Sequence, residues 1–152
     1  MDDPSVQLGF KKLLGASFKE RALTGILKVE RVAGRSAATR TFAKYPLKFL
    51  LPRKIVSRGV DAVWIFAISY GGGIVSNDSI SQKVDVGASC SAVITTQAST
   101  KIYKSVNGQF CEQILQAQVG PEGFLAVLPD PITCFAKSKY IQVRSQVPHP
   151  ES

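Results

Sequence analysis

The stretch best suited to chemistry starts at three consecutive glycines, Gly71, Gly72 and Gly73, which follow the most apolar run of the chain. Asn77 and Asp78 come shortly afterwards and supply side-chain oxygens. Glycines let backbone amides face an anion, so a phosphate site is one interpretation. The spacing matches neither G-x-x-x-x-G-K-[ST] nor G-x-G-x-x-G, however, and no helical pattern follows. We therefore expect the glycines to turn a strand sharply beside other backbone, with Asn77 and Asp78 in a second turn.

The residues that catalysis or metal binding would need are few and far apart. The single histidine, His149, is close to the end of the sequence, and Cys90, Cys111 and Cys134 are widely spaced. A Ser-His-Asp or Cys-His unit would take its base from an apparent tail, and no close cysteine pair forms a zinc motif. These observations predict a non-enzymatic protein with buried or half-buried thiols, no disulfides, no tightly bound cofactor and a reducing, cytoplasmic location.

The segments that would position these residues are predicted to be β-strands. The chain has 152 residues, of which 45% are hydrophobic and 20% charged, as in a globular domain. Short segments rich in β-branched and aromatic residues lie between glycines and prolines, which predicts an all-β fold of about nine strands. These segments are residues 25–32, 61–69, 79–86, 89–96, 101–106, 115–119, 123–129, 132–136 and 139–143.

Two of these segments carry more detailed expectations. The continuous apolar run 61–69 is typical of a strand that is buried on both faces. Segment 79–86 alternates, and Ile80, Gln82, Val84 and Val86 share one face. No repeat of fixed period is visible along the chain.

The rest of the chain predicts little regular structure. Residues 8–22 are the best helix candidate, and no helical stripe follows Pro46. We expect a single domain over residues 1–152, with residues 1–20 and 145–152 as loose tails. No apolar segment is long enough to cross a membrane as a helix.

The net charge of +8 leaves several binding functions open. A basic RNA-binding β-domain is one alternative, although the basic clusters are not interleaved with aromatic residues as a stacking platform would be. A general protein-interaction domain with an acidic partner is another. A small hydrolase that uses a serine or cysteine is a third, and its base would have to be His149.

Four segments in order, "GRSAATR", "YGGGIVSNDSI", "VDVGASCSAVITTQASTKIYKS" and "LPDPITCF", resemble the urease accessory protein D family, called H in some organisms, and are most similar to its plant members. The positions that match the family motifs are Gly72, Gly73, Val75, Asp78, Thr95, Thr96, Thr100, Lys101, Tyr103, Lys104, Ser105, Leu128, Pro129 and Phe135. The sequence departs from the motifs at Asn77, where glycine is common, at Gln97-Ala98, where Pro-Gly is frequent, and at Pro131, where glutamate is frequent. Asparagine tolerates the left-handed region better than most residues.

The resemblance implies a fold and a function. The implied fold is mainly β, with stacked sheets in a helix-like winding, and this chain corresponds to the first half of a longer family fold. The implied function is a non-enzymatic scaffold for maturation of nickel urease, which binds apo-urease and accessory protein F, with the GTPase accessory protein G joining through F. Nickel would be a transported ion, guided with carbon dioxide through an internal water-filled passage. No nucleic-acid or membrane partner is implied.

Oxygen-bearing side chains suit a transient path for a cation, because they coordinate it without forming a tight cage. Asp78, Thr95, Thr96 and Thr100 are accordingly our candidates for the passage lining. The alternative is that the threonines are ordinary strand residues and that Asp78 caps a turn.

Lys101, Tyr103 and Lys104 are candidates for contact with a protein partner, since tyrosine and basic residues suit interfaces. On a strand, Lys101 and Tyr103 share a face and Lys104 lies on the other. The alternative is that these long side chains cover apolar surface of the protein itself.

Overall fold

The computed structural model describes residues 4, 22–53 and 60–150. In these residues the fold is mainly β, and the 3-10 turn η2 (Tyr70–Gly72) links two strands. No helix among them combines the length and the hydrophobicity that crossing a bilayer requires. The predicted helix at residues 8–22 and the predicted tail at residues 1–20 lie almost wholly outside the described residues.

Twelve strands in the described part of the chain form three sheets. Sheet A has the order β12-β9-β6-β1-β2 and consists of β1 (Gly25–Val32), β2 (Arg35–Ala43), β6 (Ser79–Val86), β9 (Cys111–Val119) and β12 (Tyr140–Val147). Sheet B has the order β10-β7-β4-β3 and consists of β3 (Leu47–Leu50), β4 (Val63–Ser69), β7 (Ser91–Thr95) and β10 (Phe124–Leu128). Sheet C has the order β11-β8-β5 and consists of β5 (Gly73–Ile74), β8 (Thr100–Ile102) and β11 (Ile132–Cys134).

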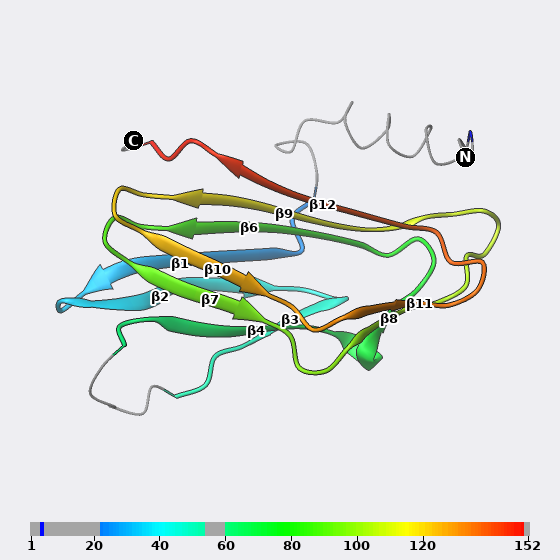
Figure 1. Cartoon of the computed structure of the whole chain (residues 1–152), viewed down its shortest axis with the longest axis horizontal. Coiled ribbons are helices and arrows are strands. Elements are labelled where there is room, and N and C mark those ends of the chain that lie inside the picture. The colour runs from blue at the N-terminus through cyan, green and yellow to red at the C-terminus, as the bar shows by residue number, and fades with distance from the viewer. Residues whose placement is uncertain (1–3, 5–21, 54–59, 151–152) are drawn as a thin grey trace.

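The chain winds repeatedly through sheets B, C and A in that order. Strands β4, β5 and β6 form one coil, β7, β8 and β9 the next, and β10, β11 and β12 the third. Each strand pairs in parallel with its counterpart one coil away. Figure 1 shows β6, β9 and β12 side by side above β10, β7 and β4. Parallel pairing requires a long crossover, and here the other two sheets supply it. The mainly β class and the helix-like winding are therefore confirmed.

Two antiparallel pairs precede this winding. β1 pairs with β2 through a register shift between Lys28 and Val29, and β3 pairs with β4. β1 also pairs in parallel with β6, which joins the hairpin to sheet A. Strands β2, β3 and β5 were not among the predicted segments. β2 carries charged and hydroxyl residues without an apolar stripe, and β5 has only two residues.

Two buried hydrophobic clusters fill the space between the sheets. The first joins sheets A and B through Leu27, Val29, Val63, Ile65, Val84, Val86, Cys90, Ala92, Ile94 and Ala117. The second joins sheets A and C and the end of sheet B through Leu47, Ile74, Ile80, Ile102 and Cys111. Burial of these side chains is the main favourable term in folding.

The prediction that segment 61–69 is buried on both faces is wrong. Val63 and Ile65 are buried in the first cluster, but Trp64, on the opposite face of β4, is 50% exposed. The continuous apolar run therefore belongs to a strand with one buried face and one exposed apolar face.

The end of the described chain is more regular than predicted. β12 extends to Val147, so residues 145–147 belong to sheet A rather than to a tail. Beyond it, the His149 side chain is 9% exposed, and its Nε2 lies 3.3 Å from Asp85 Oδ1 on β6. Ordered structure thus continues past residue 145.

A hydrogen-bonded cluster around Asp61 fastens sheet A to sheet B. The buried Ser36 on β2 donates from its backbone N to both Asp61 carboxylate oxygens at 2.9 Å and from Oγ to Oδ2 at 2.8 Å. The backbone N of Ser91 on β7 donates to Ser36 Oγ at 3.0 Å. Three segments distant in sequence therefore depend on one carboxylate.

We expect Asp61→Ala to lower the free energy of unfolding by about 2 kcal/mol, because buried donors on Ser36 lose a charged acceptor. Urea denaturation followed by circular dichroism measures this change. Glu122→Ala is the matched control, since the Glu122 carboxylate accepts an exposed hydrogen bond from Ser89 Oγ at 3.3 Å. Equal losses in the two variants would contradict the importance given to the Asp61 cluster.

Candidate functional site

A polar cavity lies inside the winding, between the two hydrophobic clusters. Gln82 on β6 stands between Ile80 of the second cluster and Val84 of the first. The cavity is lined by Ala67, Gln82, Ile94, Thr95, Thr96, Thr100, Gln113, Leu115, Val127, Pro129, Asp130, Ile132, Gln142, Val143 and Arg144. The cavity has a volume of about 40 Å³, and one buried water molecule needs about 10–15 Å³. The cavity therefore suits a few waters or a small ion, whereas organic ligands occupy ~300 Å³ or more.

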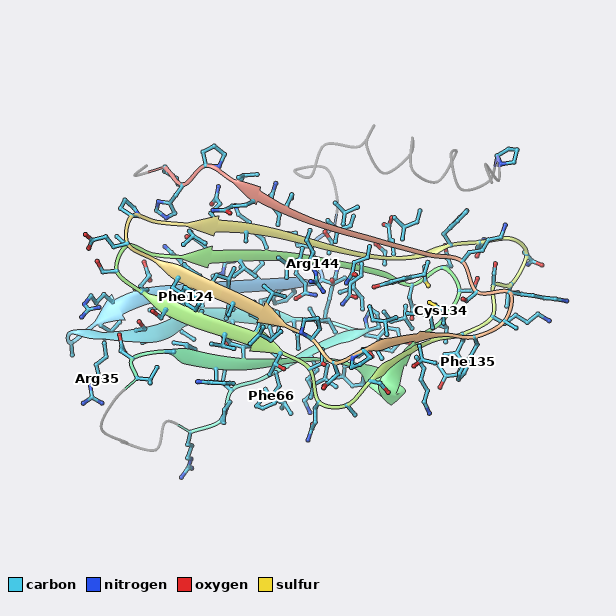
Figure 2. All side chains as sticks on the ribbon, in the orientation of Figure 1. Arg35, Phe66, Phe124, Cys134, Phe135 and Arg144 are labelled. Atoms are coloured by element: carbon cyan, nitrogen blue, oxygen red, sulfur yellow. The ribbon has the colours of Figure 1, made fainter. Side chains whose placement is uncertain are left out.

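Sheet A supplies one polar wall of this cavity. In the strand register, Gln82 on β6 aligns with Leu115 on β9 and then with Arg144 on β12. The neighbouring row aligns Gln113 with Gln142. Parallel pairing stacks these side chains from coil to coil on the inner face. Figure 2 shows Arg144 in the space between the strands of sheet A and β10.

Tyr140 orients one of these glutamines. Its hydroxyl donates to Gln113 Oε1 at 2.8 Å. Burial raises the pKa of Tyr140 well above its usual range, so the phenol remains a protonated donor at physiological pH. Because Gln113 Oε1 accepts this bond, the orientation of the Gln113 amide group is fixed.

The opposite wall is built by the segments that follow β7 and β10. Thr96 Oγ1 donates to Asp130 Oδ2 at 2.8 Å, and the Asp130 backbone N donates to Thr96 Oγ1 at 2.8 Å. This reciprocal pair fixes the side chains of Thr96 and Asp130, which belong to neighbouring coils. Thr100, at the start of β8, completes the polar part of this wall. Thr95 also borders the cavity, but it shares the outward-facing row of Phe66 and Leu128 in sheet B, and its hydroxyl donates to Leu128 O at 2.7 Å.

One buried polar atom in the cavity is an unsatisfied hydrogen-bond acceptor among the described residues. Among the residues that the structure describes, Gln82 Oε1 has no hydrogen-bond partner, and Gln82 is 2% exposed. An amide oxygen buried without a partner costs about 1–3 kcal/mol relative to a satisfied one. A water molecule or a cation in the cavity would supply that partner.

The charges and donor types favour weak, exchangeable binding. Asp130 and Arg144 line the same cavity and carry opposite charges. Within residues 22–53 and 60–150, no group of three or more His, Cys, Asp or Glu side chains could hold a metal ion. Hydroxyl and amide oxygens around one carboxylate can coordinate a passing cation without forming a tight metal site.

The glycine run forms a turn that passes close to a neighbouring coil. Gly71 and Gly72 have φ values of 69° and 71°, in the left-handed region that favours glycine. Gly73 is extended, but a Cβ added there would lie 2.3 Å from Tyr103 Cε2 and 2.9 Å from Lys101 O. The first two glycines thus make the turn, and the third permits close approach of β5 to β8.

The second turn lies away from the cavity. Asn77 has a φ of 70°, which asparagine adopts more readily than most residues other than glycine. The Asp78 carboxylate accepts a bond from Val75 N at 3.1 Å, and Asp78 N donates to Val75 O at 3.1 Å. Glu112 N also donates to Asp78 O at 2.9 Å. The structure therefore brings Thr95, Thr96 and Thr100 together at the cavity and places Asp78 in a turn.

The three candidate contact residues occupy different surroundings. The Tyr103 ring packs over Gly73 and lies edge-on to Phe135, with ring centroids 5.4 Å apart. Lys101 and Lys104 are exposed. Tyr103 therefore covers part of the protein's own surface, but at 37% exposed it is accessible to a partner, as both lysines are.

The sequence prediction missed five polar residues of the cavity: Gln82, Gln113, Asp130, Gln142 and Arg144. Gln82 could have been found, because it is the polar member of an otherwise apolar face in segment 79–86. The other four become neighbours only through the pairing of coils.

The cysteines differ in exposure, which leads to a prediction. Cys90 and Cys111 are buried, and burial raises the pKa of the Cys111 thiol to about 11. Cys134, labelled in Figure 2, is exposed on the edge strand β11, so the expectation of a buried or half-buried thiol is wrong there.

We expect iodoacetamide at pH 8 to label Cys134 at least tenfold faster than Cys90 and Cys111, because the thiolate is the nucleophile. Mass spectrometry of the native chain measures this, and urea-unfolded chain, in which all three should react, is the control. Rapid labelling of Cys111 in folded protein would contradict its burial.

Comparison with known proteins identifies the family. The model of the UreD urease accessory protein family matches residues 24–146. The chain is 57% identical over 119 residues to urease accessory protein D of Arabidopsis thaliana, covering 78% of this chain and 40% of the relative. It is 54% identical over 121 residues to urease accessory protein D of Oryza sativa subsp. indica, covering 80% and 40%.

A bacterial relative is also similar. Urease accessory protein UreD of Sorangium cellulosum is 41% identical over 122 residues, which cover 80% of this chain and 37% of the relative. The chain thus spans about two fifths of the length of the curated relatives that it matches. The match of the family model over most of the chain, together with these relatives, shows that the chain belongs to the UreD family of urease accessory proteins.

Proposed function

We propose that this chain is part of a non-enzymatic scaffold for urease maturation in the cytoplasm. The scaffold binds apo-urease and accessory protein F, and the GTPase accessory protein G joins through F. Nickel is carried as a transported ion and passes through the polar interior. Membership of the urease accessory family supports the general role, and the polar cavity motivates the route for the ion.

The observation that carries the proposed route is the unpartnered oxygen of Gln82 in a small polar cavity. A buried apolar core would be more stable without this group. Its presence near Thr96, Thr100 and Asp130 gathers side-chain oxygen atoms around the cavity instead. A partly hydrated cation can exchange its waters for these oxygens and leave again, because no tight cage forms.

Asp78 has a structural part in this proposal. Its carboxylate closes the turn that starts β6, so we assign the passage to Thr96, Thr100 and Asp130. Gln142 and Arg144 on the edge strand β12 form the more exposed side of the cavity.

Co-purification with a nickel-dependent activation assay tests the proposal. The chain is expressed with apo-urease and accessory proteins F and G, and both the bound partners and the urease activity are measured. Thr96→Val should preserve partner binding but lower activation severalfold, because it removes the hydroxyl that pairs with Asp130. Thr133→Val is the matched control, since Thr133 is exposed on β11 and lies outside the cavity lining.

The outcomes separate the parts of the proposal. If the unmodified chain binds its partners but does not activate urease, the scaffold function is supported. Part of the route would then lie in the portion of the relatives that this chain does not cover. Equal activation by Thr96→Val and Thr133→Val would remove Thr96 from the route. Failure of the folded chain to bind either urease or accessory protein F would overturn the scaffold function.

A separate variant tests the partner contact. Lys104 is exposed beside the Tyr103–Phe135 pair, so Lys104→Glu should reduce co-purification of apo-urease or accessory protein F by about tenfold if an acidic partner surface meets it. Lys83→Glu on the outer face of sheet A controls for net charge. Unchanged co-purification with Lys104→Glu would remove this residue from the interface.

A further inference from the structure

The outer face of sheet B is apolar, and its large side chains on β3, β4 and β10 are exposed or half-buried, whereas Val93 on β7 is buried. Its side chains alternate with those of the first hydrophobic cluster and come from all four strands of the sheet. The strand register places them in four rows: Ser91 and Phe124; Trp64, Val93 and Ala126; Leu50, Phe66, Thr95 and Leu128; Lys48 and Ile68. We call these residues the sheet B face.

Large apolar side chains dominate the sheet B face. Trp64 is 50% exposed, Phe124 58% and Leu128 61%. Phe66 and Phe124 belong to an inner and an edge strand of the same sheet (Figure 2). Contiguous exposed apolar residues of this size mark interaction surfaces more often than scattered ones do. Aromatic side chains are also the usual anchors of protein interfaces.

A hollow at one side of this face offers an anchor pocket. It is lined by Leu50, Leu51, Pro52, Phe66 and Gln97 and has a volume of about 270 Å³. Its lining is apolar except for Gln97, so it suits a leucine or phenylalanine side chain from a partner. Leu50 and Leu51 are 38% and 40% exposed, which leaves them accessible to such a side chain.

The charge around the face defines the partner. The sheet B face contains no acidic residue, Lys48 lies within it, and the exposed Arg53 follows Pro52 at the hollow. A second copy of the chain would bring Lys48 and Arg53 towards their own counterparts in a two-fold contact, on a protein of net charge +8. Acidic residues beside an apolar stripe complement this surface.

The geometry of the sheet defines the partner's secondary structure. β4 and β7 pair on both sides within sheet B, so their backbone groups cannot accept an added strand. A helix can instead lay an apolar stripe across the face, as helices do when they cover sheets. We propose that the sheet B face docks an amphipathic α-helix of a partner protein, with acidic residues flanking its apolar stripe. This inference is independent of the proposed route through the cavity.

Single-stranded nucleic acid is the competing occupant, because exposed aromatic rings beside a lysine can stack bases. The composition of the sheet B face argues against this occupant, since the exposed Leu50 and Leu128 and the half-buried Ile68 outnumber its single basic residue, Lys48. A nucleic-acid surface carries many phosphate-binding cations. The test below includes RNA to decide between the two.

The fluorescence of Trp64 measures docking directly, because Trp64 is the one tryptophan of the chain and lies on this face. The probes are two synthetic helical peptides with the same leucine stripe, one flanked by glutamates and the other by lysines, and a single-stranded oligouridine. We expect the glutamate peptide to shift Trp64 emission to shorter wavelength in a saturable titration. The lysine peptide should bind at least tenfold more weakly, and the oligouridine should leave the emission unchanged.

Three variants of the full chain locate the contact. Leu128→Asp should weaken binding of the glutamate peptide about tenfold, and its exposure makes the substitution compatible with folding. Lys48→Glu should reverse the preference between the two peptides. Ser145→Asp, exposed on β12 of sheet A, is the control and should bind as the unmodified chain does.

Other results would overturn the inference. An emission shift with oligouridine but not with the glutamate peptide would assign the face to nucleic acid. A shift that appears on raising the concentration of the chain alone would assign it to a second copy. Equal binding of both peptides, or equal effects of Leu128→Asp and Ser145→Asp, would show that the sheet B face is not the proposed docking surface.

Discussion

Replacing Gly73 with alanine is expected to lower the free energy of unfolding by about 3 kcal/mol, at the upper end of the usual cost of overpacking. The added Cβ would lie 2.3 Å from Tyr103 Cε2 and 2.9 Å from the Lys101 carbonyl oxygen. The tyrosine ring can rotate away. The carbonyl cannot move freely, because Lys101 pairs with Gly73 in sheet C. Urea denaturation of the two proteins measures the loss.

Gly71→Ala is the matched control for this effect. Gly71 has a φ of 69°, but a Cβ there would meet no atom of the described residues within 4 Å. Only the left-handed backbone penalty of about 1 kcal/mol applies. The double variant Gly73→Ala with Tyr103→Ala separates the two obstacles, since it should recover little stability if the carbonyl dominates. A loss at Gly71 as large as that at Gly73 would contradict the close-approach argument.

The strands were predictable where sequence pattern and burial agree. Segments 25–32 and 79–86 match β1 and β6, because one face of each strand packs into the core and the other does not. The apolar run 61–69 misled us on burial, since its outward residues form the sheet B face. A continuous apolar pattern cannot distinguish a doubly buried strand from one with an exposed binding face.

The winding itself was expected from the family resemblance and not from periodicity. Val63 pairs with Ala92, and Ala92 pairs with Leu125, so successive coils advance the chain by unequal lengths. Turns of different length connect the strands and conceal the structural repeat from a search for a fixed period. Strand pairing between coils restores the alignment in three dimensions.

For the same reason, only part of the polar cavity could be predicted from the sequence. Thr96 and Thr100 were candidates because they lie in a recognisable motif. Asp130 meets Thr96 across one coil, and Arg144 reaches the row of Gln82 across two coils. Such neighbours are fixed by register, which depends on loops and core packing together. Gln82 was the exception, because its own strand marks it as polar on a buried face.

Replacing Gln82 with leucine is expected to raise the free energy of unfolding by about 1–2 kcal/mol while lowering nickel-dependent urease activation severalfold. Leucine removes a buried oxygen that has no partner, and it fits between the apolar neighbours Ile80 and Val84. The same change removes an oxygen from the proposed route. Denaturation and the activation assay are therefore expected to move in opposite directions.

Gln116→Leu on the outer face of β9 is the matched control, and it should change the free energy of unfolding by less than about 0.5 kcal/mol and leave activation unchanged. A stabilised Gln82→Leu protein with full activation would separate stability from function and remove Gln82 from the route. A destabilised variant would show that the oxygen is already satisfied by bound water. A gain of stability together with a loss of activation would instead support a role for the Gln82 oxygen in the proposed route. The chain would then keep an unfavourable buried group because the passing ion needs it.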